Sequence, residues 1–82
     1  MEDTSTFIKR KLAEFVREQR EKAGFTGDKQ IHGYTFDELE ANASTIGAST
    51  LFAIFEEFFN PQDTHRFWFE LQVGIYERKK GA

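Results

Sequence analysis

The sequence predicts an α+β fold in which two or three helices pack on one long C-terminal β-strand. The prediction rests on residues 64–80, where apolar side chains recur at every second position, namely Phe67, Phe69, Leu71, Val73 and Ile75. Successive strand side chains point to opposite faces, so these five residues would form one apolar face against the helices. The segment is also rich in aromatic and β-branched residues, a composition typical of strands.

A single strand leaves a row of backbone donors and acceptors unpaired, which favours pairing with another strand. We therefore expect a homodimer, in which residues 67–75 of two chains pair antiparallel across a two-fold axis and complete the sheet. This prediction also buries Phe69, so that replacing it by alanine would cost about 3–5 kcal/mol. The expected core comprises Ile8, Leu12, Phe15, Leu39, Ile54, Phe58, Phe67, Phe69, Leu71 and Val73.

Length and composition indicate one small domain over residues 1–82. The chain has no cysteine, which fits a reducing compartment, and its ten phenylalanines can supply the core. No apolar run is long enough for a transmembrane helix, and the first residues, MEDTSTFIKRK, lack the hydrophobic centre of a signal peptide. We therefore expect a cytoplasmic protein that does not bind membranes.

The first element is an amphipathic helix over residues 7–23. Asp3 to Thr6 offer N-caps, and Gly24 suits the residue after the helix. Residues 25–34 form a connection, in which residues 29–32 can make a short strand, the only partner within the chain for the long strand. Thr35 and Glu38 then form a capping box, so the second helix begins at Phe36.

The second helix is expected to break or kink near residues 44–47, because Gly47 is unfavourable inside a helix. The small residues there can instead let a neighbouring helix approach closely. A third helix over residues 50–59, capped by Ser49, is apolar on most sides except at Glu56 and Glu57. Residues 60–63 would end it and turn the chain into the strand.

The sequence carries no recognisable catalytic or cofactor-binding motif. Its histidines, His32 and His65, lie in separate connections, and a metal site would need more ligands than they supply. Glu56 and Glu57 are adjacent on a helix, so they cannot act together on one substrate. We therefore expect a protein that is not an enzyme and holds no cofactor or metal.

Residues 12–26, LAEFVREQREKAGFT, resemble the opening helix of Cro/Xre-type helix-turn-helix repressors. Glu38-Leu39 and Ser49-Thr50-Leu51 are similar to that family's second and third helices. The resemblance implies a dimeric DNA-binding transcriptional regulator. Residues 27–35 lengthen the first connection, however, and the recognition helix would present apolar and acidic side chains in place of base-reading polar ones, namely Leu51, Phe52, Phe55, Glu56 and Glu57.

The main functional prediction is non-enzymatic protein binding, by a small adaptor or inhibitor-like module of the kind that phages and other mobile elements encode. DNA binding by a dimeric regulator is the alternative, and nucleic acid is the less favoured partner. If the strand's apolar face meets the helices, Trp68 and Tyr76 point outward beside Glu70. Trp and Tyr concentrate binding energy at interfaces, so we expect this outward face to bind a protein, with Arg66 and Arg78 steering an acidic surface. A loop or the second chain can equally cover these aromatic residues.

Overall fold

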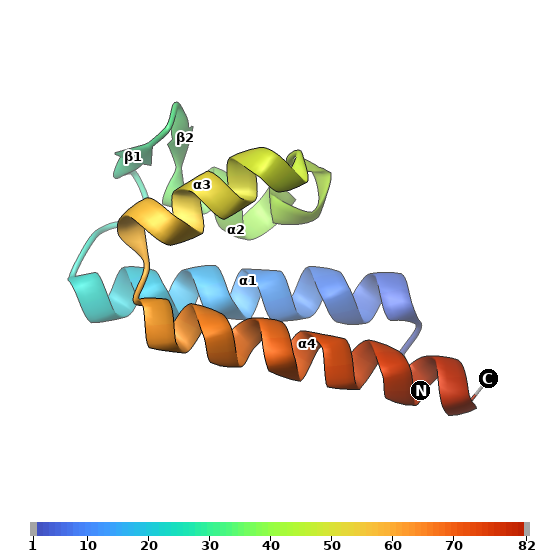
Figure 1. Ribbon diagram of the computed structural model, residues 1–82. Helices are drawn as coiled ribbons and strands as arrows, with labels where there is room; N and C mark the ends of the chain where they lie inside the picture. The colour runs from blue at the N-terminus through green and yellow to red at the C-terminus, as the bar shows by residue number, and fades with distance from the viewer. Residues whose placement is uncertain (1, 82) are drawn as a thin grey trace.

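A computed structural model describes residues 2–81 of the chain, which form a helical domain with one very short hairpin. The elements are α1 (Thr4–Ala23), β1 (Gln30–Ile31), β2 (Tyr34–Thr35), α2 (Phe36–Asn42), a 3₁₀ turn (Ala43–Thr45), α3 (Ala48–Phe58) and α4 (Pro61–Gly81). Helix α1 lies between α4 on one side and the α2–α3 pair on the other (Figure 1). Helices α1 and α4 run antiparallel, so the start of α1 and the end of α4 lie at the same end of the molecule.

The predicted α+β fold is wrong, because residues 64–80 form the body of helix α4 and not a strand. The preceding residue, Asn60, caps this helix, since its side-chain oxygen accepts a hydrogen bond from the Asp63 amide at 3.0 Å. Pro61 occupies the first helical position, which it favours because it has no N–H to leave unpaired. The antiparallel strand pairing expected across a homodimer is therefore also wrong, because residues 67–75 form no strand.

Two periodicities fit the apolar residues of α4, and the burial of its residues separates them. Phe67, Leu71 and Ile75 are spaced by four, so they share a face in a helix as well as in a strand. Phe67 and Leu71 are buried, and Ile75 packs against the core. Phe69 and Val73, which only a strand would bring to that face, are 63 % and 39 % exposed.

The core centres on stacked phenylalanines from three helices. Phe15 of α1 stacks on Phe67 of α4, with ring centroids 4.4 Å apart, and meets the edges of Phe55 and Phe59 at 5.3 and 5.5 Å. Of the expected core residues, Leu12, Phe15, Leu39, Ile54, Phe67 and Leu71 are buried and Ile8 packs at the edge. Phe58, Phe69 and Val73 are exposed, so their expected burial is wrong.

The local signals in the first half of the chain placed the end of α1 and the start of α2 correctly, but α1 begins at Thr4 and not at Phe7. Asp3 caps α1, and Gly24 ends it in the left-handed region at φ 77°. The capping box of Thr35 and Glu38 is present in both directions, and α2 begins at Phe36 as predicted. The predicted break after α2 is also confirmed, although α3 starts from Gly47 without a side-chain cap and not from Ser49.

The short strand expected near residues 29–32 forms as β1, but it pairs with β2. His32 and Gly33 between them both have positive φ, at 52° and 81°, the conformation that tight two-residue hairpins require. One residue of this hairpin, Ile31, is buried in the core. The two strands are therefore a local cover on the helices and not a sheet on which they pack.

Candidate functional site

An aromatic groove lies between α3 and α4. It has a volume of about 390 Å³ and is lined by Phe52, Phe55, Glu56, Pro61, Thr64, His65 and Trp68. The ring of Phe52 is half exposed and lies 5.1 Å from the Trp68 ring, while Trp68 packs inward against Phe55 at 5.6 Å. The groove therefore offers aromatic rings with one side free to solvent and the other held by the core.

The charge at this groove is negative and comes from one carboxylate. Glu56 lines it, whereas Glu57 bonds His32 at 2.7 Å and does not line the groove. Residues 30–60 contain no lysine or arginine. The His65 ring on the opposite wall supplies the only ionisable nitrogen among the lining side chains. Apolar rings with an acidic border can bind an apolar side chain that a basic surface surrounds.

A second apolar surface runs along the outer side of α4. Phe69, Val73 and Tyr76 lie three and four residues apart, so they form one stripe along the helix. Phe69 and Tyr76 are 63 % and 66 % exposed, the highest values among the exposed large hydrophobic residues. The stripe faces away from Phe67 and Leu71, which fill the core from the other side of α4. Helix α4 thus has two apolar faces, of which the fold uses one.

A buried glutamine joins α1 to the start of α4. The side-chain oxygen of Gln19 accepts a hydrogen bond from the Asn60 amide, and its nitrogen donates to the Asp63 carboxylate, both at 3.0 Å. Lys22 also donates to Asp63, at 2.7 Å, and Arg66 donates at 2.9 Å. These donors, Lys22 first and Gln19 second, hold the pKa of Asp63 below its ordinary value. The polar joint therefore fixes where α4 leaves α1.

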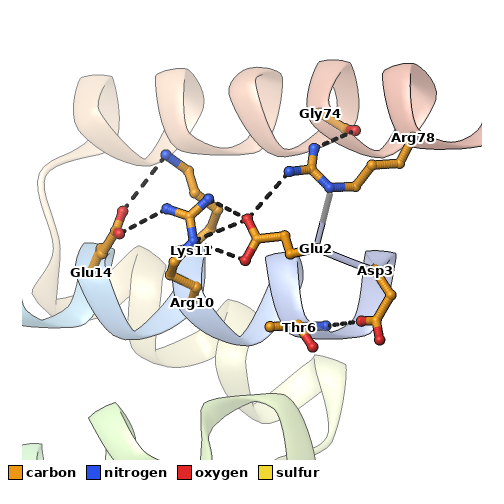
Figure 2. A network of polar contacts seen from close by, with 8 residues as sticks. All are labelled: Glu2, Asp3, Thr6, Arg10, Lys11, Glu14, Gly74 and Arg78. Carbon is orange, nitrogen blue, oxygen red and sulfur yellow. Dashed lines mark hydrogen bonds and ion pairs between the residues drawn. The ribbon is translucent and has the colours of Figure 1, made fainter. Parts of the chain in front are cut away.

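A polar clamp ties the other end of the α1–α4 pair together (Figure 2). Glu2 accepts hydrogen bonds from Arg10 of α1 at 2.6 Å and from Arg78 of α4 at 3.2 Å. The bond from Arg10 is the main reason why the pKa of Glu2 lies below its ordinary value. Arg10 also pairs with Glu14 one turn along α1, at 2.9 Å. The clamp joins the start of α1 to the last turns of α4.

Arg78 also has an apolar role in this clamp. Its guanidinium lies 3.7 Å from the centre of the Phe7 ring, a cation–π contact, and donates to the Gly74 carbonyl at 3.0 Å. Gly74 lies directly against the Phe7 ring, where a Cβ atom would clash with ring carbons. The glycine is thus required for close approach of α1 and α4. Arg78 is only 18 % exposed, and its contacts are with its own chain.

The structure separates the five residues predicted to bind a partner into three places. Trp68 turns inward to the groove, and Arg78 belongs to the clamp. Tyr76 belongs to the outer stripe, and Arg66 and Glu70 are exposed beside it. The residues assigned to the dimer strand divide in the same way, since Phe67, Leu71 and Ile75 face inward and Phe69 and Val73 face outward. Whether any of these residues binds a partner stays a prediction.

Sequence reasoning missed Phe52 as a surface residue and assigned Phe69 and Val73 to the wrong face. The signal for Phe52 was present, because residues 50–59 are apolar on more sides than a small domain can cover. The signal for α4 was the run Asn60-Pro61-Gln62-Asp63, which matches a helix N-cap as well as a turn. If these residues are interpreted as a helix N-cap, a helix begins here and Phe69 lies on its outer face.

No protein-family model matches this chain, and no curated protein or solved structure matches it significantly. Within residues 2–80, no three or more metal-ligating side chains come together. None of the helices in the part of the chain that the structure describes is long and apolar enough to cross a membrane. The functional assignment therefore rests on the two apolar surfaces and the charges beside them.

Proposed function

We propose that the protein is a non-enzymatic binding module of adaptor or inhibitor type, and that the groove between α3 and α4 receives an apolar side chain of a protein partner. The observation that carries this proposal is the half-exposed Phe52 ring beside Trp68. Aromatic rings that are rigidly supported from behind and open in front are typical of the residues that dominate binding energy. Here Phe55 provides that support, because it is buried and contacts the Trp68 ring.

The chemistry of the groove points to a partner with a basic surface around an apolar anchor. Glu56 borders the groove, so a lysine or arginine near the anchor would gain a favourable charge pair. Such pairs mainly raise the rate of association and the specificity, while the buried anchor supplies most of the affinity. We place this interaction in the cytoplasm, because a chain without cysteine suits a reducing compartment.

A dimeric DNA-binding regulator of helix-turn-helix type remains the alternative proposal. In that function α3 would enter the major groove with its exposed side chains. The exposed residues of α3 include Phe52, Glu56 and Glu57, and none of them is a lysine or arginine. Carboxylates repel phosphate and a phenylalanine reads few base edges, so the surface of α3 favours protein binding.

The groove proposal is tested with a Phe52→Ala variant and a matched control. Phe58→Ala, on the same helix, removes a ring that is 44 % exposed and does not line the groove. Partners captured from the source cells by immobilised wild-type protein are identified, and the Kd of a purified partner is measured for all three proteins. We expect Phe52→Ala to weaken binding about 30-fold, the effect of losing about 2 kcal/mol at a central aromatic contact, and Phe58→Ala to change it little.

Two results would contradict the groove proposal. One is an unchanged Kd for the Phe52→Ala variant, provided that its thermal unfolding matches that of the wild type. The other is retention of the wild-type protein on DNA that weakens steeply as salt is added, which is typical of phosphate contacts and would support the regulator.

A further inference from the structure

We propose that a second copy of this chain docks on the outer stripe of α4, so that two α4 helices pair antiparallel about a two-fold axis. This interface is separate from the groove, which lies on the side of α4 that faces α3. It uses Phe69, Val73 and Tyr76, none of which the protomer's own core requires.

The stripe is more apolar than a solvated helix face needs to be. Its three side chains are 63 %, 39 % and 66 % exposed, and they follow one another at helical spacing on a 21-residue helix. Helix α4 forms one edge of the molecule (Figure 1). Phe69 and Val73 border an open hollow beside Phe7 and Lys11 of α1. A helix of this length extends about 30 Å, which gives a second helix a long and accessible face.

The charges beside the stripe are what select a second copy as the occupant. Arg66 lies three residues before Phe69, and Glu77 follows Tyr76 directly, so opposite charges stand at the two ends of the stripe. Both lie on the flank of α4 that faces α1, because Arg66 lines one hollow and Glu77 another, and Lys11 of α1 lines both. Among the residues that the structure describes, Glu77 has no ion-pair partner within the chain, while Arg66 bonds Asp63 at 2.9 Å and is still 61 % exposed. Glu70 lies between them on the same flank and lines both hollows.

An antiparallel two-fold pair brings these charges together. In such a pair the same flank of each helix meets itself, and the two ends exchange places. Arg66 of each copy then faces Glu77 of the other when the axis passes between Leu71 and Gln72, midway between the two charges. That position is one residue from the midpoint of the stripe, so one register aligns the two stripes and pairs Arg66 with Glu77. A parallel pair would instead place this flank of one helix against the opposite flank of the other, so Arg66 and Glu77 would not meet.

The oligomeric state is measured by sedimentation equilibrium from about 1 µM to about 1 mM. We expect the wild type to shift from one to two chain masses within this range. Phe69→Ser is expected to remain a monomer, and Phe52→Ser to dimerise like the wild type. The two variants are matched, because each removes one exposed phenylalanine from a helix, and only the first removes it from the stripe.

Charge reversal tests the antiparallel register. Arg66→Glu gives the flank an acidic residue at both ends, and Glu77→Arg gives it a basic residue at both ends. Each variant alone should dimerise about tenfold more weakly than the wild type, since two opposite-charge pairs become like-charge pairs. An equimolar mixture of the two variants should restore dimers that contain one chain of each, and added salt should shrink these differences.

Three results would overturn this proposal. The first is a wild-type protein that stays monomeric at every concentration, which would leave the stripe to another protein. The second is a dimer that survives Phe69→Ser and is lost in Phe52→Ser, which would make the groove the contact between copies. The third is a mixture of the charge variants that dimerises no better than either alone. The first and third results leave the groove proposal's own measurement, the Kd of the Phe52→Ala variant, untouched.

Discussion

Replacing Phe15 by alanine should destabilise the fold by about 3–5 kcal/mol, a cost typical of removing a buried phenylalanine. The Phe15 ring is buried, and its centroid lies within 5.5 Å of three other phenylalanine rings. These are Phe55 of α3, Phe67 of α4 and Phe59 between the two helices. Loss of the Phe15 ring would leave a cavity where the three helices meet. Small domains have little more stability than this, so we expect the variant to be largely unfolded by circular dichroism at 25 °C.

Phe69→Ala is the matched control for that result. The Phe69 ring is 63 % exposed on the other side of α4, so we expect its removal to change the free energy of unfolding by less than about 0.5 kcal/mol in the monomer. Denaturant unfolding of both variants at low protein concentration separates the two effects. If Phe69→Ala unfolds as readily as Phe15→Ala, residues 64–80 face the core as a strand would require.

Replacing Gln19 by alanine should cost about 1–3 kcal/mol, although Gln19 is a polar residue on a helix. Its side chain is buried and bonds both the Asn60 amide and the Asp63 carboxylate. Without it, the Asn60 amide loses its hydrogen-bond partner where α4 begins. In a domain of this size each kcal/mol lowers the melting temperature by about 4–8 °C, so thermal unfolding checks the prediction.

Gln19→Glu isolates the bond to Asp63, because the variant keeps the shape of the side chain. The introduced carboxylate can still accept from the Asn60 amide, but it cannot donate to Asp63 and repels it instead. This repulsion raises the pKa of the introduced carboxyl in the folded state, so the variant's deficit should shrink as the pH falls toward about 4. A deficit that is constant or grows as the pH falls would show that Gln19 does not bond Asp63.

The sequence predicted those parts of the fold for which one residue type allows few conformations. Gly24 ends α1, and the capping box at Thr35 begins α2, because these signals act through local backbone bonds. Residues 64–80 were assigned wrongly because apolar side chains on two opposite faces of a helix can also fall at every second position. The length of the whole stretch, residues 64–80, argued against a strand, since strands seldom exceed about ten residues.

The candidate site was less predictable than the fold, because it depends on which face of each helix the neighbouring helices cover. Trp68 was expected to point outward, whereas its ring packs against Phe55 and lies beside Phe52 of another helix. Arg78 was expected at a binding rim, and the structure uses it to hold Phe7 and Glu2. Residue type alone does not distinguish an arginine that clamps its own chain from one that steers a partner.

The helical state of residues 61–81, with Phe67 inward and Phe69 outward, is tested most directly by solution NMR on the full chain. We expect nuclear Overhauser effects between successive amide protons along residues 64–80, together with contacts between the Phe67 and Phe15 rings and none between Phe69 and Phe15. Strong effects from each α-proton to the next amide along residues 67–75, with cross-strand contacts between two chains, would contradict the helix and restore the strand.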